Sequence, residues 1–137
     1  MSNFDIAYKR TCKFEGGWVN DDADSGEETY KGISRVANPK WAGWSIIDQY
    51  KKKSNFPKNL DSDVKLQELV KQCYRNNYWN NVWGDKINHQ DVANDLYDTA
   101  VNMGVAISIK LVERQFKMKE TGKMSKNLLD KLNSVTR

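Results

Sequence analysis

The sequence predicts a mainly α fold in a single domain, with at most a small β-hairpin near residues 18–32. Apolar residues recur at spacings of three and four in several segments, which is typical of amphipathic helices. No segment alternates apolar and polar residues over a long stretch, as a half-buried strand would. A chain of 137 residues suits one domain and can bury a core without disulfide bonds.

The first helix is expected over residues 4–15, where the apolar spacing is helical. Gly16 and Gly17 follow it, and glycine commonly follows a helix C-terminus, so Glu15 would lie in the last helical turn. Residues 17–32 are rich in Gly, Asn, Asp and Ser, and they predict an ordered loop or a short irregular hairpin. Residues 33–37 are then expected to form one helical turn.

The remaining apolar stripes predict five further helices. They are expected over residues 46–52, 63–80, 91–103 and 105–119 and, after Ser125, over the last segment of the chain. Ser45, Ser62 and Ser125 precede the first, second and last of these stripes, and serine is a favoured N-cap residue. These assignments leave no room for a larger sheet.

Composition restricts the classes of function. The net charge of +4 and the pI near 9.0 suit an anionic polymer such as nucleic acid or bacterial cell wall. No run of 18 apolar residues predicts a membrane span, and the N-terminus does not resemble a secretory signal peptide. Cys12 and Cys73 are interpreted as small core residues. We expect no metal site, because His89 lacks ligand-like neighbours. The run Lys51–Lys53 is expected to lie in solvent at a helix end.

The most informative segment runs from Glu15 to Gly32 and reads E-G-G-W-V-N-D-D-A-D-S-G-E-E-T-Y-K-G. Its many carboxylates could form a solvated acidic loop or a calcium loop. The EF-hand pattern does not fit, because a register starting at Asp22 lacks the third oxygen ligand and a register starting at Asn20 places Ser25 at the glycine position.

Glycoside hydrolysis explains the segment better. That reaction needs a protonated acid that gives a proton to the glycosidic oxygen, and usually a second, ionised carboxylate. Glu15, next to Phe14 and near Trp18, is expected to be partly desolvated, which favours its protonated form. Asp24 lies in a polar loop where a carboxylate stays charged, and Thr29 is placed to orient a water molecule.

The segment from Glu15 to Ile33 resembles the signature of glycoside hydrolase family 108, approximately E-G-G-[YW]-[VS]-x-[DN]-P-x-D-x-G-G-x-T-x-x-G-I. Residues 91–104 are similar to a second block of that family, D-x-x-[FY]-D-x-x-V-N-x-G. The chain departs from the signature at Asp22, where the family often has proline, and at Glu27, where it often has glycine. Both departures lie outside the acid itself.

This resemblance implies a lysozyme-like muramidase that cleaves the β-1,4 bond between N-acetylmuramic acid and N-acetylglucosamine. Glu15 matches the family's catalytic acid, whereas Asp24 and Thr29 follow from the chemistry above, and a single-acid mechanism stays open. Residues 1–90 would form a catalytic half and residues 91–137 a helical half, which the family treats as a peptidoglycan-binding region. Some members are known as secretion activator proteins, and others resemble phage endolysins.

Several polar and aromatic residues are candidates for substrate binding. Trp18 could stack on a sugar ring or pack in the core, and Asn20 and Tyr30 lie beside the acidic segment. Asp98 and Asn102 are four residues apart on one helix. They could line a groove opposite the Glu15 loop or form a buried polar pair that ties the helix to that loop.

The expected partner is the glycan strand of peptidoglycan, bound by a monomer without a cofactor and without stable membrane insertion. A non-catalytic wall-binding or secretion-accessory protein is the alternative. Nucleic acid is not expected as a partner, because the acidic segment would repel phosphates. The protein would be made in the cytoplasm and reach the wall or periplasm after release, with a holin-like export partner.

Overall fold

The structure is a computed structural model that describes residues 1–13, 17–21 and 27–134. The chain forms two compact units. Residues 1–13 and 73–137 form one, here called the helical unit, and residues 14–72 form the other, here called the sheet unit. In the helical unit, the N-terminal segment packs with the C-terminal part of the chain.

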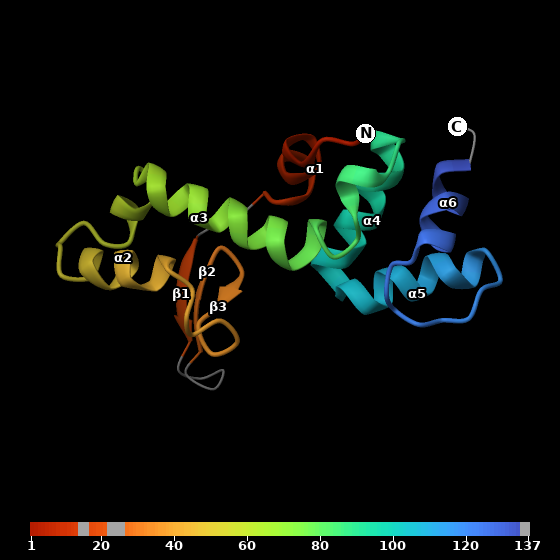
Figure 1. The fold of residues 1–137 in the computed structure, drawn as a ribbon. Coiled ribbons are helices and arrows are strands. Elements are labelled where there is room, and N and C mark those ends of the chain that lie inside the picture. The colour runs from red at the N-terminus through yellow and green to blue at the C-terminus, as the bar shows by residue number, and fades with distance from the viewer. Residues whose placement is uncertain (14–16, 22–26, 135–137) are drawn as a thin grey trace. The chain divides into compact units, whose positions relative to one another are not determined.

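The helical unit is built around α4 (Gln90–Met103), which packs against both α1 (Phe4–Thr11) and α5 (Val105–Gln115) (Figure 1). Three rings from separate segments meet in its core: Phe4 lies 5.6 Å from Trp79 and 5.8 Å from Tyr97, measured between ring centroids. Trp79 and Tyr97 are fully buried. The other elements of this unit are η2 (Arg75–Trp79), η3 (Gly84–Lys86) and α6 (Lys126–Ser134).

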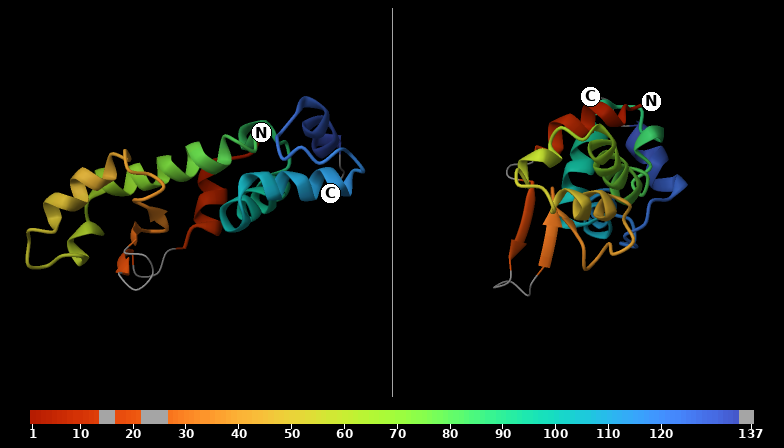
Figure 2. Two further views of the ribbon diagram at one scale, coloured as in Figure 1. Left: turned by 90° about the horizontal axis from the view of Figure 1, so that it is seen from below. Right: turned by 90° about the vertical axis from the view of Figure 1, so that its left-hand side faces the viewer.

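The sheet unit contains a three-stranded antiparallel sheet in the order β1 (Trp18–Asp21), β2 (Glu27–Tyr30) and β3 (Ile33–Ser34). Figure 2 shows β1 and β2 side by side, and their register pairs Trp18 with Tyr30 and Asp21 with Glu27. The helices of this unit are α2 (Gly43–Tyr50), η1 (Lys58–Leu60) and α3 (Val64–Tyr74), whose last two residues fall within the helical unit.

The structure confirms the mainly α class and the hairpin near residues 18–32, and it corrects the first helix. α1 ends at Thr11, and its C-cap residue is Cys12, so the helix does not extend to residue 15 as expected. Residues 14–16 lie outside the described residues.

The segment predicted as a helical turn at residues 33–37 begins instead with strand β3. The turn between β2 and β3 explains the difference, since both of its central residues, Lys31 and Gly32, have positive φ angles of 47° and 81°. Two positive φ angles define the type I′ hairpin turn, whose twist matches that of the flanking strands. Ile33 is therefore directed back to pair with Tyr30.

The helices of the second half begin close to the predicted positions. The Oγ atom of Ser125 accepts a hydrogen bond from the amide of Leu128 at 3.1 Å, as expected of an N-cap. At α3, however, Asp63 rather than Ser62 accepts the amide of Leu66, at 2.8 Å. Ser45 lies inside α2 and is not its N-cap.

Two helix lengths were overestimated. The predicted helix 63–80 is an α-helix only to Tyr74 and continues as the π-helical segment η2, and the predicted helix 105–119 ends at Gln115. Trp79, at the end of η2, lies directly against Gly84, where a Cβ atom would collide with its indole ring. Gly84 is thus required for the packing of Trp79.

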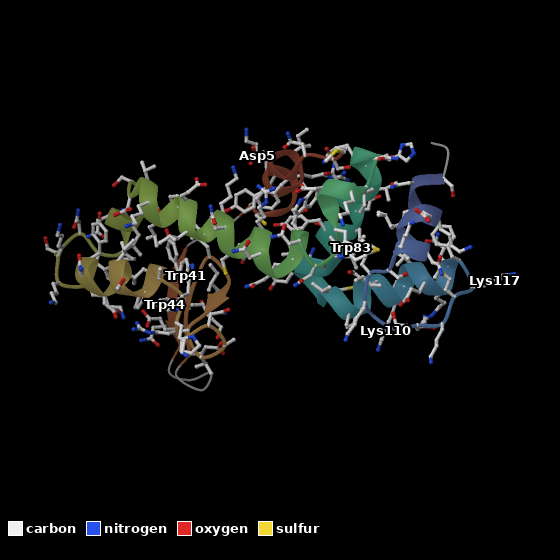
Figure 3. All side chains as sticks on the ribbon, in the orientation of Figure 1. Asp5, Trp41, Trp44, Trp83, Lys110 and Lys117 are labelled. Carbon is white, nitrogen blue, oxygen red and sulfur yellow. The ribbon has the colours of Figure 1, made fainter. Side chains whose placement is uncertain are left out.

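Of the remaining tryptophans, Trp41 and Trp44 meet edge to face with ring centroids 5.2 Å apart in the sheet unit (Figure 3). Trp44 is 2% exposed, and its indole nitrogen donates to the backbone oxygen of Asn38 at 2.8 Å. This pair is core packing. No helix among the described residues is long and apolar enough to cross a bilayer.

Candidate active site

The central residues of the predicted site, Glu15 and Asp24, lie outside the described residues. The strands that follow each of them in the chain are described. Residues 14–16 lead into β1, and residues 22–26 connect β1 to β2. The sheet is therefore the described framework of the site.

The sheet separates the predicted site residues onto its two faces. Successive side chains of a strand point to opposite faces, and paired residues share a face. The register places Trp18, Asn20 and Tyr30 on one face. Thr29, paired with Val19 on β1 and Ser34 on β3, lies on the other. One face of the sheet thus cannot present Thr29 together with Trp18 and Tyr30.

The face that carries Thr29 is partly open. Val19 is 50% exposed, and Thr29 is half-buried. On the same face, the hydroxyl of Ser34 donates to the carboxylate of Glu27, which links β3 to β2. This face thus combines a half-buried hydroxyl with an exposed valine.

The face that carries Trp18 and Tyr30 also carries Glu28, whose side chain is 11% exposed. Its Oε2 atom accepts the indole N–H of Trp18 at 2.7 Å and lies 2.7 Å from the Lys51 Nζ atom. Its Oε1 atom accepts from Arg35 at 3.0 Å. Asp48 on α2 completes the cluster, with two hydrogen bonds of 2.8 Å from Arg35. Glu28 therefore links the sheet to α2 and fixes the indole ring.

The charged groups of this cluster shift one another's pKa values. Burial alone would raise the pKa of the Glu28 carboxyl, but the hydrogen bonds from Lys51, Trp18 and Arg35 outweigh burial and lower it. The Arg35 guanidinium lowers the pKa of Asp48 to about 2. Both carboxylates stay ionised at neutral pH, so Glu28 is unsuited to act as a general acid.

Tyr30 is 1% exposed, and its hydroxyl accepts from the Gln67 Nε2 atom at 2.8 Å. The Gln67 Oε1 atom in turn accepts from the Lys31 Nζ atom at 2.5 Å. Tyr30 is a candidate for substrate binding, and the structure gives its side chain a buried position. Gln67 on α3 ties the end of the hairpin to that helix.

A pocket of about 570 Å³ lies at this end of the sheet. It is lined by Gly17, Trp18, Tyr30, Lys31, Pro57, Lys58 and Asp61. Trp18 meets Phe56 edge to face at 4.8 Å, so its ring is fixed on two sides, by Phe56 and by Glu28. Of the residues predicted to bind substrate, the structure brings Trp18 and Tyr30 together in one pocket.

Asp98 and Asn102 belong to the helical unit, and both are exposed on α4. The Oδ1 atom of Asp98 accepts from the Thr11 hydroxyl at 3.1 Å, which ties α4 to the end of α1. Asn102 donates to the backbone oxygen of Asp98 at 2.9 Å, not to its carboxylate. The alternative of a buried polar pair is wrong, because both residues are exposed. A groove between this helix and the Glu15 loop stays a prediction.

Sequence analysis missed four residues of this arrangement: Arg35, Asp48, Lys51 and Gln67. Lys51 was assigned to a solvated run, but its ammonium group bridges Glu28 and Asp48, at 2.7 and 3.1 Å. The one available signal was the opposite charge of Asp48 and Lys51 at a helical spacing of three. Within the described residues, no group of three or more potential metal-ligating side chains occurs.

Comparison with known proteins yields a family and a fold. No curated protein matches the chain significantly. The structure of SagA from Brucella abortus superposes with a TM-score of 0.62 and 23% sequence identity, covering 97% of this chain and 70% of that one. This likeness shows a shared fold. The family model described as Glycosyl hydrolase 108 matches residues 8–104, a range that includes Glu15, the whole sheet and Asp98. The chain therefore belongs to the glycosyl hydrolase 108 family.

Proposed function

We propose that this protein is a peptidoglycan muramidase, which cleaves the β-1,4 bond between N-acetylmuramic acid and N-acetylglucosamine with Glu15 as general acid. The observation that carries the proposal is the family match over residues 8–104, which places the E-G-G-W segment within a glycoside hydrolase domain. A glycoside hydrolase needs a carboxylic acid close to its saccharide groove, and Glu15 directly precedes the sheet described above.

In the proposed reaction, the Glu15 carboxyl protonates the glycosidic oxygen as the bond to the anomeric carbon breaks. A water molecule then bonds to that carbon and loses one proton to the Asp24 carboxylate. Thr29 supports this scheme, because its face of the sheet is partly open and its hydroxyl can orient the water. Glu28 is excluded as the acid by its lowered pKa.

The opposite face of the hairpin contributes binding. Trp18 is half-buried, and the hydrogen bond to Glu28 holds its indole ring in one orientation. Aromatic faces stack on the apolar C–H surfaces of sugar rings, and a fixed ring loses little entropy on binding. Asn20 is exposed and available to an acetamido or hydroxyl group. Asp98 and Asn102 are proposed as further polar contacts from α4.

The direct test is mass analysis of peptidoglycan digested by the purified protein. Fragments with a reducing N-acetylmuramic acid end are expected. Reducing N-acetylglucosamine ends would show a glucosaminidase, and 1,6-anhydro ends would show a transglycosylase. The absence of any fragments, combined with sedimentation of the protein with insoluble peptidoglycan, would favour the non-catalytic binding alternative.

The role of Asp24 needs its own comparison. We expect Asp24→Asn and Asp24→Ala to lower kcat on cell-wall suspensions by about 100-fold, which is within the usual range for a general base. Thr29→Val should lower it less, because another group can still activate the water. Near-normal rates in both Asp24 variants would leave Glu15 acting alone.

A further inference from the structure

The pocket beside Trp18 carries charges that the cleavage scheme does not use. Its lining includes Lys31, in the turn between β2 and β3, and Lys58 and Asp61, around η1. Lys58 and Asp61 are exposed, and Lys31 is half-buried. The described residues that line this space of about 570 Å³ therefore carry two positive charges and one negative charge at neutral pH.

Lys31 occupies an unusual backbone position for its residue type. With φ at 47° it takes the first central place of a type I′ turn, where asparagine, aspartate or glycine is favoured. A left-handed conformation costs a residue with a Cβ atom about 1 kcal/mol. The hydrogen bond from its ammonium group to Gln67 orients the side chain toward α3. The turn thus holds a cation at a defined point on the pocket wall.

The pocket is close to the proposed acid along the chain. Gly17 lines it, and only one residue separates Gly17 from Glu15 in the sequence. A pocket this near the proposed acid in the sequence suits a substituent of the sugar that is cleaved.

We propose that this pocket binds an acidic peptide substituent of the glycan strand, with Lys31 and Lys58 pairing its carboxylates. The proposal rests on the proposed function, because it needs peptidoglycan as the substrate. In that polymer, short peptides with free carboxylates branch from the muramic acid, which is the sugar on one side of the scissile bond. Trp18 would contact the sugar, and the two lysines would contact its peptide. The protein would accordingly prefer peptide-bearing strands to bare glycan.

The experiment compares kcat/KM on two substrates from the same wall preparation, freed of covalently attached anionic polymers. One retains its peptides, and the other has been stripped of them by an amidase. Lys58→Ala and Lys31→Asn should each lower the ratio of kcat/KM between peptide-bearing and bare strands by about threefold, as expected for loss of one partly exposed ion pair. Asparagine at position 31 retains the preferred turn chemistry while it removes the charge.

Asp61→Asn should change the ratio of kcat/KM in the opposite direction to the two lysine variants. Removing the negative charge leaves the positive excess larger, so the ratio should rise. Lys40→Ala is the matched control, because Lys40 is an exposed lysine of the same unit outside the pocket. Its ratio should equal that of the wild type. Circular dichroism establishes that each variant is folded.

Failure of this proposal is distinguishable from failure of the proposed function. If the wild type cleaves both substrates and the ratio is the same in Lys58→Ala, Lys31→Asn and Lys40→Ala, the pocket does not bind the peptide. A ratio that falls in Asp61→Asn would also overturn it. If the wild type cleaves neither substrate, the muramidase proposal itself is wrong.

Discussion

The two units of this protein are stabilised by different interactions. The helical unit has an apolar core in which the Phe4, Trp79 and Tyr97 rings meet. The sheet unit joins its hairpin to α2 through the carboxylate of Glu28 and to α3 through Gln67. The sheet unit also buries apolar side chains, among them Ile47 and Leu60, but it adds a partly buried charged cluster beside the strands that carry Trp18 and Thr29. Hydrogen bonds and charge therefore help to position the strands nearest the proposed chemistry.

Truncation in the apolar core should have the largest effect on stability. We expect Trp79→Ala to lower the free energy of unfolding by about 3–5 kcal/mol, because it removes a fully buried ring and leaves a cavity beside Gly84. Urea denaturation measures the loss. Val36→Ala is the control, since Val36 is 74% exposed and should change little. Similar losses in both variants would contradict this account of the core.

Neutralising Glu28 should lower the free energy of unfolding by less than Trp79→Ala does. Glu28→Gln leaves Arg35 and Lys51 with Asp48 alone, and hydrogen bonds to charged groups contribute about 1–3 kcal/mol. Glu27→Gln is the matched control, one position away and on the other face of the sheet. Urea denaturation should show the larger loss for Glu28→Gln. If Glu27→Gln costs as much, the cluster does not hold the sheet unit together.

Lowering the pH should destabilise the sheet unit, because it protonates Glu28 and Asp48. The pKa of Asp48 in the folded protein is about 2, and that of Glu28 is also lowered, so both carboxylates bind protons less readily in the folded than in the unfolded state. Their stabilising contribution is complete above about pH 5, where both groups are ionised in the unfolded chain too, and is lost as the pH falls toward 2. Between pH 4 and pH 2, the Tm of Asp48→Asn should fall less steeply than that of the wild type. Parallel curves of Tm against pH for the wild type and Asp48→Asn would contradict the stabilising role of these carboxylates.

The smallest effect is expected at the surface of the helical unit. Arg114 and Glu120 form two hydrogen bonds, of 2.9 and 3.1 Å, but the Arg114 side chain is 66% exposed. Such exposed pairs contribute little. Arg114→Ala should therefore leave the Tm unchanged in differential scanning calorimetry. A fall in Tm as large as that of Glu28→Gln would contradict the proposed difference between the two units.

Elements with long apolar stripes and clear caps were predictable from the sequence. α4 begins one residue before its predicted start and ends where it was expected, and Ser125 caps α6. The strand β3 was not predicted, because its two residues are too few to show alternation. Its signal was the turn before it, where Gly32 follows Lys31.

The candidate site was predictable only in part. The segment that begins at Glu15 was recognisable from its sequence alone. The cluster around Glu28 was not, because its partners Arg35, Asp48 and Lys51 come from a separate turn and from the α2 region. The separation of Thr29 from Trp18 depends on the pairing register, which a one-residue shift would reverse.

We propose Glu15 as the general acid of a muramidase. The most direct measurement is the rate at which Glu15→Gln releases reducing muramic acid ends from purified peptidoglycan, compared with Glu68→Gln. Glu68 is an exposed carboxylate on α3 and controls for the loss of one charge. We predict a loss of at least about 100-fold for Glu15→Gln and a wild-type rate for Glu68→Gln. Equal rates for Glu15→Gln and the wild type would show that the acid lies elsewhere.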